Sequence, residues 1–303
     1  MTPEVIPWMS PCLSQSMSFV LAGIGHPMKF RRGDVIYTSP GLFGNLMYVR
    51  SGFVVKALLD PVRDEPLLLS MAGPGALCGN YENLYVRDRM PRRHWCLTST
   101  EVLVVNQELL LKIADQNPEW QHELSGYSSV SSICDRMGMF LNYSGTVEER
   151  LGALLLLMLH CEKPAAMANL FSKGVEWVEL PFYPDKGTIA RLLGCKFETV
   201  SDVVRQWGSH DDIRRRSRRI WLRRRTFLKY WEWLMPFMQQ SRAEERRALE
   251  EANVRAYEEK QARAARKAEE RHDPIRVKSR VKAPSSPIEG HLGRTAADVE
   301  AGR

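Results

Sequence analysis

The residues with the clearest chemical potential are eight arginines within twelve positions, in the stretch RRRSRRIWLRRR at 214–225. A guanidinium group stays charged and donates several hydrogen bonds in one plane, so such a cluster is suited to phosphate groups. Residues 145–235 hold 16 lysines and arginines against 11 acidic residues, whereas residues 1–144 hold 12 against 13. This local concentration of positive charge indicates a nucleic-acid-binding region, and a solvated basic loop is the other interpretation.

Motifs for enzyme chemistry are missing from the sequence. There is no Ser/His/Asp or metal-ligand pattern, and the glycine-rich stretch GPGALCGN lacks the lysine of a P-loop. The six cysteines, at 12, 78, 96, 134, 161 and 195, form no C-x-x-C pair, which predicts free thiols in a reducing compartment. No signal peptide is expected, and the longest apolar run, LGALLLLML, has nine residues, too few to span a membrane. We therefore expect a cytoplasmic protein that is not an enzyme and does not enter a membrane.

Residues 28–116 contain many short segments typical of strands. Glycine- and proline-containing turns separate them at intervals of roughly 8–12 residues, which favours a sandwich or barrel. The stretch QELLLKIADQ predicts a short helix that ends this region. The strand segments are DVIYTS, LMYVRSGFVVKALLD, EPLLLSMAGPGALCGN and RHWCLTSTEVLVVN.

A long helix is predicted to begin at Pro118, because proline suits the first helical turn. Apolar residues then recur at intervals of three and four as far as Leu141, which is the pattern of one apolar face. This stripe could pair with a second copy of the chain or pack on the chain's own barrel. We expect both, because the stripe is broader than a two-helix seam. Its members are Trp120, Leu124, Tyr127, Val130, Ile133, Cys134, Met137, Phe140 and Leu141.

The region after the long helix has the signals of a helix-turn-helix. Thr146 and Glu149 predict a capping box, which makes 143–146 a hinge. Asp185 can cap the helix KGTIARLLG, Gly194 can end it, and FETVSDVVRQW predicts a second helix. RRIWLRRRTF predicts a strand of a β-hairpin. After residue 236 the chain predicts a charged, solvated helix and then disorder.

This order of elements resembles the Crp/Fnr superfamily of bacterial transcription regulators over roughly residues 28–228. The resemblance is carried by RRGDVIY, LMYVRSGFV and GPGALCGN in the strand region, and by TVEERL and IARLLGCKFETVSDVVRQW beyond it. It implies an α+β chain with an N-terminal double-stranded β-helix (jelly-roll) effector domain, a long dimerisation helix and a C-terminal winged helix-turn-helix. It also implies a homodimer that binds palindromic double-stranded DNA, responds to an unknown small-molecule effector and contacts RNA polymerase. The expected domains are 1–117, 118–142 and 143–235, followed by a tail at 236–303.

The resemblance also places an effector pocket, but with departures from the members that bind cyclic AMP. Asn80 follows glycine where those members have glutamate, and Met90 stands in the place of the phosphate-binding arginine. Asp135 replaces a hydroxyl residue and would repel a phosphodiester, so cyclic AMP is not expected. The pocket residues are Gly79, Asn80, Tyr81, Met90, Arg92, Arg93, Asp135 and Arg136.

The same resemblance raises two other cofactors, an iron–sulfur centre and haem. Members with an iron–sulfur centre carry an N-terminal cysteine cluster, and Cys12 alone does not supply one, so no cluster is expected. Haem binding remains possible, and the alternative interpretation is that its candidate ligands are ordinary residues of the barrel. The candidate haem ligands are His26, His94, Cys78, Cys96 and Met90, with Tyr81, Tyr85 and Trp95 as pocket residues.

The second helix of the helix-turn-helix departs from the family pattern Ser-Arg-Glu. It begins Lys196-Phe197-Glu198, and Asp202 stands where a cation is common. The arginines are found instead in the hairpin, where they can take phosphates without reading sequence. The alternatives are a degenerate helix-turn-helix that binds nucleic acid without specificity, and a haem-based gas or redox sensor. The expected DNA-binding residues are Lys196, Phe197, Glu198, Ser201, Arg205, Arg214, Arg215, Arg216, Arg218 and Arg219.

Overall fold

The computed structural model divides the chain into two compact units, residues 1–243 and 244–303. In the second unit only 255 and 259–263 are described, and they are helical. Met90, Arg218 and Tyr85 lie outside the described residues, as does most of the tail predicted for 236–303. The structure describes residues 5–38, 45–60, 62, 66–84, 91–168, 170–172, 174–216, 219–238, 255 and 259–263.

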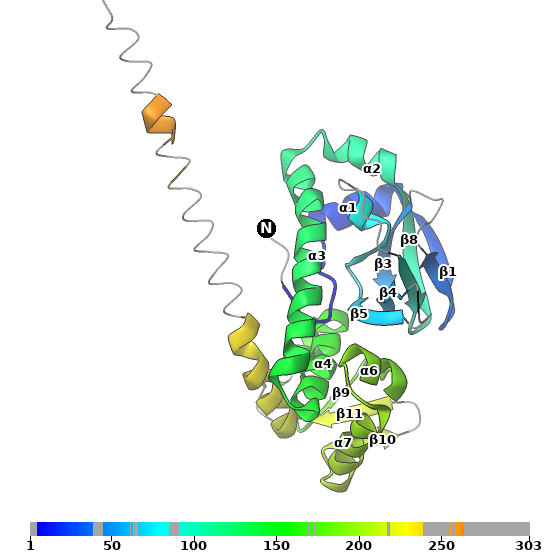
Figure 1. The fold of residues 1–303 in the computed structure, drawn as a ribbon, viewed down its shortest axis with the longest axis vertical. Coiled ribbons are helices and arrows are strands. Elements are labelled where there is room, and N and C mark those ends of the chain that lie inside the picture. Colours follow the sequence, from blue (N-terminus) through cyan, green and yellow to red (C-terminus); the bar gives the residue numbers. More distant parts are fainter. Residues whose placement is uncertain are drawn as a thin grey trace, which may run out of the picture. The chain divides into compact units, whose positions relative to one another are not determined.

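The N-terminal part of the first unit is a roll of two four-stranded antiparallel sheets (Figure 1). Their strand orders are β1-β8-β3-β6 and β2-β7-β4-β5. The predicted sandwich or barrel is therefore confirmed, with the strands close to the predicted segments. The strands are β1 His26–Phe30, β2 Val35–Thr38, β3 Asn45–Ser51, β4 Val54–Leu59, β5 Pro66–Ala72, β6 Leu77–Gly79, β7 Arg92–Cys96 and β8 Thr100–Asn106.

Helical segments surround the roll. The predicted helix after the last strand is present, and Asn106 caps it by accepting from the backbone N–H of Leu109 at 3.0 Å. A helix before the first strand was not predicted; its Met17 and Leu21 are fully buried against the roll. The segments are α1 Gln15–Ile24, the 3-10 turn η1 Tyr81–Asn83 and α2 Gln107–Ala114.

The long helix α3 (Pro118–Ser144) begins as predicted, with proline in its first turn and Asn117 as its cap. Leu124, Tyr127 and Leu141 are fully buried within the chain's own hydrophobic clusters. The apolar stripe thus packs back on its own chain, which is one of the two uses predicted for it. The other use, a seam with a second copy, has to involve side chains that this packing leaves exposed.

The segment before α1, residues 5–13, forms an N-terminal arm that lies against α3. Trp8 is fully buried and lies against Gly138, where a Cβ atom would come within 2.6 Å of the indole. Its Nε1 donates to the side-chain oxygen of Asn142 at 3.3 Å. Only a residue without a side chain at 138 lets the indole lie this close to the helix, so the arm and α3 are fitted to each other.

The C-terminal part of the unit begins with the predicted capping box. Thr146 accepts from the backbone N–H of Glu149, and the Glu149 carboxylate accepts in return from Thr146. Asp185 caps the next predicted helix by accepting from the backbone N–H of Thr188 at 2.8 Å. The elements are α4 Val147–Glu162, α5 Pro164–Ala168, β9 Trp177–Glu179, α6 Lys186–Leu192, α7 Phe197–Ser209, β10 Ile213–Arg216 and β11 Arg219–Arg223.

The stretch RRIWLRRRTF is only partly a strand, so that prediction was half wrong. β11 ends at Arg223, and residues 224–238 are helical. Phe227, Tyr230, Leu234 and Met238 recur at three and four positions and are buried in the same core as α4 and α7. The helix therefore continues past the predicted start of the tail at 236, because its apolar face is needed to complete this core.

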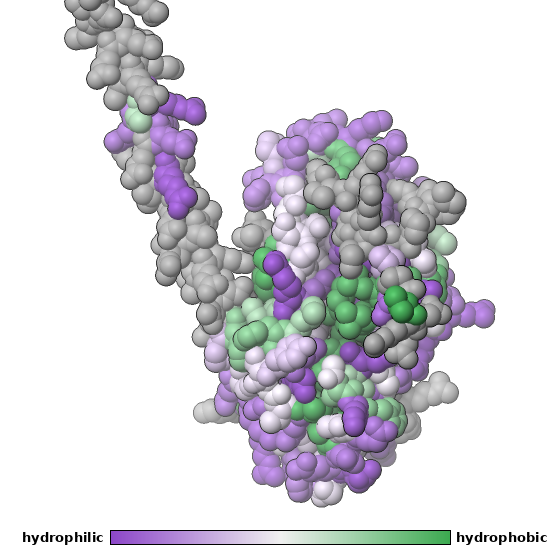
Figure 2. All heavy atoms as spheres, in the orientation of Figure 1, coloured by the Kyte–Doolittle hydropathy of each residue, from purple (hydrophilic) through white to green (hydrophobic). Residues whose placement is uncertain are grey.

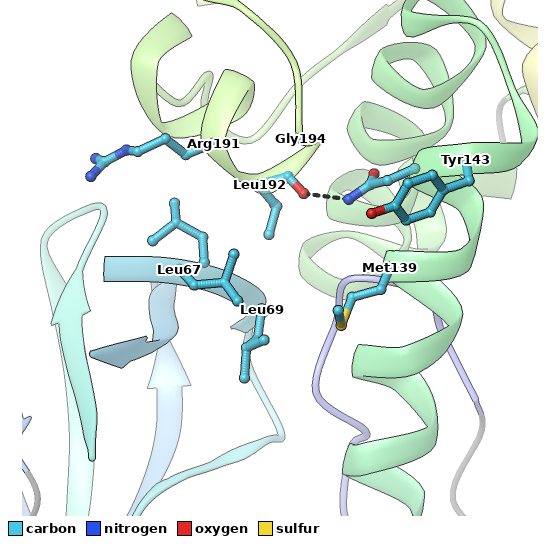
Figure 3. A pocket seen from close by; sticks show the side chains of 9 residues that line it. Leu67, Leu69, Met139, Tyr143, Arg191, Leu192 and Gly194 are labelled. Atoms are coloured by element: carbon cyan, nitrogen blue, oxygen red, sulfur yellow. Dashed lines mark hydrogen bonds between the residues drawn. The ribbon is translucent and has the colours of Figure 1, made fainter. Parts of the chain in front are cut away.

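One buried guanidinium joins three helices. Arg150 of α4 is 7% exposed, and its Nη1 donates to the carbonyl oxygens of Asn142 at 2.5 Å and Leu193 at 2.7 Å. These carbonyls end α3 and α6, where a helix leaves its last C=O groups without internal partners. The Asn142 amide also donates to the carbonyl of Leu192 at 3.0 Å, the bond drawn in Figure 3.

A small apolar cleft lies at this junction of β5, α3 and α6 (Figure 3). Leu67, Leu69 and Met139 line it, while Arg191 extends away from Met139. Figure 2 shows hydrophobic side chains gathered over this region, whereas the end that carries α7 and β10 is mostly hydrophilic. No helix in the described part of the chain is both long and apolar enough to cross a membrane.

Candidate nucleic-acid interface and roll interior

A lysine stands in the middle of the apolar strand β4 and points into the roll. Lys56 is 2% exposed, and its cross-strand neighbours are Ser70 on β5 and His94 on β7. Side chains alternate along a strand, so Lys56 faces the same side as Val54, which packs with Cys96 inside the roll. The side chains that face the interior therefore change from apolar at Val54 to polar at Lys56, two positions further along β4.

The Lys56 ammonium is held by groups from the roll and from α3. Its Nζ lies 2.6 Å from a carboxylate oxygen of Asp135 and 3.5 Å from Glu82. It also donates to the hydroxyls of Tyr81 at 2.9 Å and Ser131 at 3.1 Å. Because a buried charge is costly unless it is paired and hydrogen-bonded, this set of partners makes the buried lysine tolerable.

A second ion pair adjoins the first. Arg92 on β7 pairs with Glu82, whose side chain is only 7% exposed. Glu82 also accepts from the Tyr81 hydroxyl at 3.1 Å. The cluster of Lys56, Arg92, Glu82 and Asp135 is thus neutral in sum, with charges of both signs compensated inside the chain.

Beside this cluster lies His94, fully buried. The backbone N–H of Gly79 donates to its Nδ1 at 3.0 Å, so in the neutral ring Nε2 carries the proton. Burial, and then the nearby charges of Lys56 and Arg92, hold the pKa of His94 well below its ordinary range. His94 is therefore a neutral ring that accepts a hydrogen bond at Nδ1, while its buried Nε2 has no hydrogen-bond partner among the described residues.

The structure brings together only some of the predicted pocket residues. Tyr81, Arg92 and Asp135 meet at Lys56, while Gly79 and Asn80 lie beside His94 and Tyr37. The other two described residues lie elsewhere. Arg93 alternates with Arg92 along β7 and so points to the other face, and Arg136 is exposed on α3. Lys56, Glu82 and Ser131 were missed, although a lysine inside the apolar run FVVKALLD is a signal that could have identified the first of them.

The candidate haem ligands are spread over both sheets. His26 is exposed at the start of β1, and His94 is buried in β7 of the other sheet. The thiols of Cys78 and Cys96 lie in the apolar interior, where burial raises the pKa of each. None of these observations tests the haem prediction, which therefore stays a prediction.

The second helix of the predicted helix-turn-helix, α7, presents a polar face to solvent. Gly194 takes the left-handed conformation, with φ +60°, in the turn after α6. Val200, Val204 and Trp207 are buried and hold α7 in place. The opposite face exposes the predicted contact residues Lys196, Phe197, Glu198 and Arg205.

Two contacts order the beginning of this face. Lys186 of α6 donates to the hydroxyl of Ser201 at 3.2 Å and lies 5.9 Å from the centre of the Phe197 ring. One turn further on, Arg205 forms an exposed ion pair with Asp202 at 2.8 Å. The ion pair with Asp202 compensates part of the charge of Arg205. The carboxylate of Glu198, in contrast, has no ion-pair partner among the described residues.

The strands β10 and β11 form the arginine hairpin. Its arginines differ in whether an acidic side chain already pairs with them. Arg214 donates twice to the Asp211 carboxylate, at 2.9 and 2.8 Å, and this bond lowers the pKa of Asp211. Arg219 lies 3.5 Å from Glu179. Arg215 and Arg216 are exposed and have no acidic partner among the described residues. The charge available for phosphates is therefore concentrated on these last two.

No family model matches the chain, and no curated protein matches it. The chain is similar to the solved structure of FixK2 from Bradyrhizobium japonicum, with a TM-score of 0.52 and 19% identity over 68% of this chain and 97% of that one. A CRP-family transcriptional regulator from Thermus thermophilus gives 0.52 and 16% identity over 67% and 95%. CprK in complex with OCPA gives 0.50 and 12% identity over 73% and 95%.

This chain has the Crp/Fnr fold. The predicted fold class, a β-roll followed by a long helix and a winged helix-turn-helix, is thereby confirmed. Within the Crp/Fnr fold the Lys56 cluster lies between the roll and its long helix α3, and the exposed face of α7 lies beside the arginine hairpin.

Replacing Lys56 tests whether the roll interior depends on the ion pair. Lys56→Met should lower the free energy of unfolding by about 3–5 kcal/mol, because it leaves the buried Asp135 carboxylate without its cation. Asp135→Asn should also destabilise, and the double variant should recover a large part of the loss. Urea denaturation of the four proteins measures this coupling. Lys112→Met, which changes an exposed lysine on α2, is the matched control and should change stability by no more than about 0.5 kcal/mol. Losses that simply add would show that the two residues act independently.

Proposed function

We propose that the chain is a homodimeric, DNA-binding transcription regulator of Crp/Fnr type. The observation that carries the proposal is the exposed polar face of α7. The buried face of the same helix fixes its position, and the arginine hairpin lies beside it. A helix presented in this way can enter the major groove while neighbouring cations contact the backbone. The similar structure from Thermus thermophilus is itself a transcriptional regulator.

Each exposed residue of α7 has a role that its chemistry suits. Glu198 lies in the first turn and can accept a hydrogen bond from a cytosine amine, while Phe197, 52% exposed, can touch a thymine methyl group. Ser201 and Arg205 continue along the helix towards a base edge and a phosphate. Arg215 and Arg216 would supply most of the salt-dependent affinity from the hairpin.

We infer that the roll does not respond to cyclic AMP. The Asp135 carboxylate faces the interior and is paired with Lys56, so an entering phosphodiester would meet a filled and compensated site. The backbone N–H of Gly79, a natural anion donor, is already bonded to His94. Any effector has to be a different molecule or has to displace these bonds, and RNA polymerase remains the expected partner of the DNA-bound dimer.

The dimer would form through the face of α3 that its own roll leaves open. Ser125, Ser129, Arg136, Phe140 and Tyr143 recur at intervals of three, four and seven along this face. Phe140 is 55% exposed and Tyr143 is 90% exposed. This spacing matches the seam between two parallel helices.

The α7 and hairpin residues should have separable effects on DNA binding. Glu198→Ala should cost on the order of 1–3 kcal/mol on an operator selected from random duplexes and should relax preference at one base pair. Replacing Arg214, Arg215 and Arg216 by alanine should weaken all duplexes alike and reduce the salt slope by about one for each lost phosphate contact. Fluorescence anisotropy with operator and scrambled duplexes at two salt concentrations measures both effects.

The opposite pattern would contradict the assignment of α7. If Glu198→Ala keeps the discrimination between operator and scrambled duplex while the arginine variant loses it, α7 is not the reading helix. If the unaltered protein shows no discrimination at all, the chain binds nucleic acid without specificity.

Light scattering tests the dimer face. Ser129→Glu combined with Tyr143→Glu should give the mass of a monomer, because each carboxylate would face its twin in a buried seam. Leu109→Glu on α2, which is also an exposed apolar position, should leave the dimer intact. A double variant that keeps the dimer mass would place the interface elsewhere.

Isothermal titration calorimetry tests the inference about cyclic AMP. No binding should be detected at micromolar nucleotide, because the charge cluster already fills the interior of the roll. A saturating titration with a micromolar or tighter Kd would overturn this inference, and it would leave the assignment of α7 unaffected.

A further inference from the structure

Two tryptophans lie on the outer face of the three-stranded sheet β10-β11-β9. Trp221 on β11 and Trp177 on β9 are each next in sequence to a buried residue, Leu222 and Val178. Leu222 and Val178 are paired across the strands and belong to the core. Because side chains alternate along a strand, both tryptophans point away from this core.

Arginines complete the same face. Arg214 is paired with Trp221 across the strands, and its guanidinium lies 3.9 Å from the centre of the Trp177 ring. Arg223 approaches the same ring at 5.5 Å. The double hydrogen bond from Arg214 to Asp211 fixes the plane of the guanidinium, so this flat cationic surface is present before any ligand arrives.

Together these side chains line an open groove. Its lining residues are Trp177, Trp221, Arg214, Arg215 and Arg216, and its volume is about 420 Å³. This volume lies in the range of small-molecule and cofactor sites, about 300–1,000 Å³. A groove made of aromatic rings and guanidinium groups is suited to a flat, electron-rich group joined to an anion.

We propose that this groove binds an unpaired nucleobase of a nucleic-acid strand. The base stacks on Trp221 and on the guanidinium of Arg214, and Arg216, which lies on the same face of β10 as Arg214, takes an adjoining phosphate. In an intact duplex the faces of the bases are covered by their neighbours, so only an unstacked base can use the tryptophan surface. An acidic peptide would match the arginines but would leave the two ring surfaces without a planar partner.

The proposal rests on the proposed nucleic-acid function and extends it to a second kind of substrate. α7 would read the duplex, while the outer face of the hairpin sheet would hold a strand where the duplex is open, as at a melted or mismatched site. The hairpin arginines contribute to both surfaces, but Glu198 belongs only to α7 and Trp221 only to the groove, so substitutions at these two residues can separate them.

The test uses the full chain, a short labelled oligothymidine and a duplex of the same length. Trp221→Ala should weaken binding to the single strand roughly 5- to 150-fold, as expected for one lost base-stacking contact, and should change duplex binding less than about twofold. Trp221→Phe keeps a ring and should retain most of the affinity. Phe19→Ala, which removes an 80% exposed aromatic side chain from α1, is the matched control and should change neither. Thermal unfolding shows whether each variant is folded.

Three outcomes would overturn the proposal: equal losses on single strand and duplex, no loss on either, or competition by polyglutamate that disappears in Trp221→Ala, which would indicate an acidic protein partner.

Failure of the proposed function would give a different experimental pattern. Glu198→Ala should alter duplex selectivity and leave single-strand affinity unchanged, and a lack of duplex selectivity in the unaltered protein would not affect the Trp221 comparison.

Discussion

The position of the helix-turn-helix depends on the guanidinium of Arg150. It donates to carbonyls at the ends of two helices, α3 and α6, from inside a third, α4. The bond to the Leu193 carbonyl is buried, and without it this carbonyl would lack a partner at a cost of about 1–3 kcal/mol. One side chain therefore fixes where the long helix stops and where the first helix of the DNA-binding motif stops, and α7 takes its orientation from that arrangement.

The interior of the roll also depends on buried polar groups that need partners, and here the groups carry charges of both signs. Lys56 joins the roll to α3, because its ammonium contacts Tyr81 on one side and Ser131 and Asp135 on the other. In a roll whose interior were only apolar, α3 could slide along the surface with little penalty. A directional ion pair favours one register of α3 against the sheet, and it couples any change in the interior to the helix that continues to the hinge.

Local signals in the sequence were sufficient for the elements that depend on a few neighbouring residues. The capping box at Thr146, the cap at Asp185 and the turn at Gly194 were all predicted from short patterns and are present. The helix at 224–238 was missed because its first residues are arginines that continue the strand pattern, and its apolar face is defined only by α4 and α7. Which residues meet in the roll was also beyond the sequence, since Lys56 and Asp135 lie far apart in the chain and only the folded roll brings them together.

The close fit between Trp8 and α3 has a consequence for how the chain is made. The bond from Trp8 to Asn142 joins residues 134 positions apart, and Gly138 lies just before the second of them. At ordinary rates of synthesis the arm leaves the ribosome on the order of ten seconds before its partners. During that interval the indole of Trp8 and the side chain of Met9, both fully buried in the folded chain, have no place to pack. The arm is thus synthesised well before its partners but is among the last segments to be fixed, and its apolar residues are open to chaperones or to another nascent chain until α3 is complete.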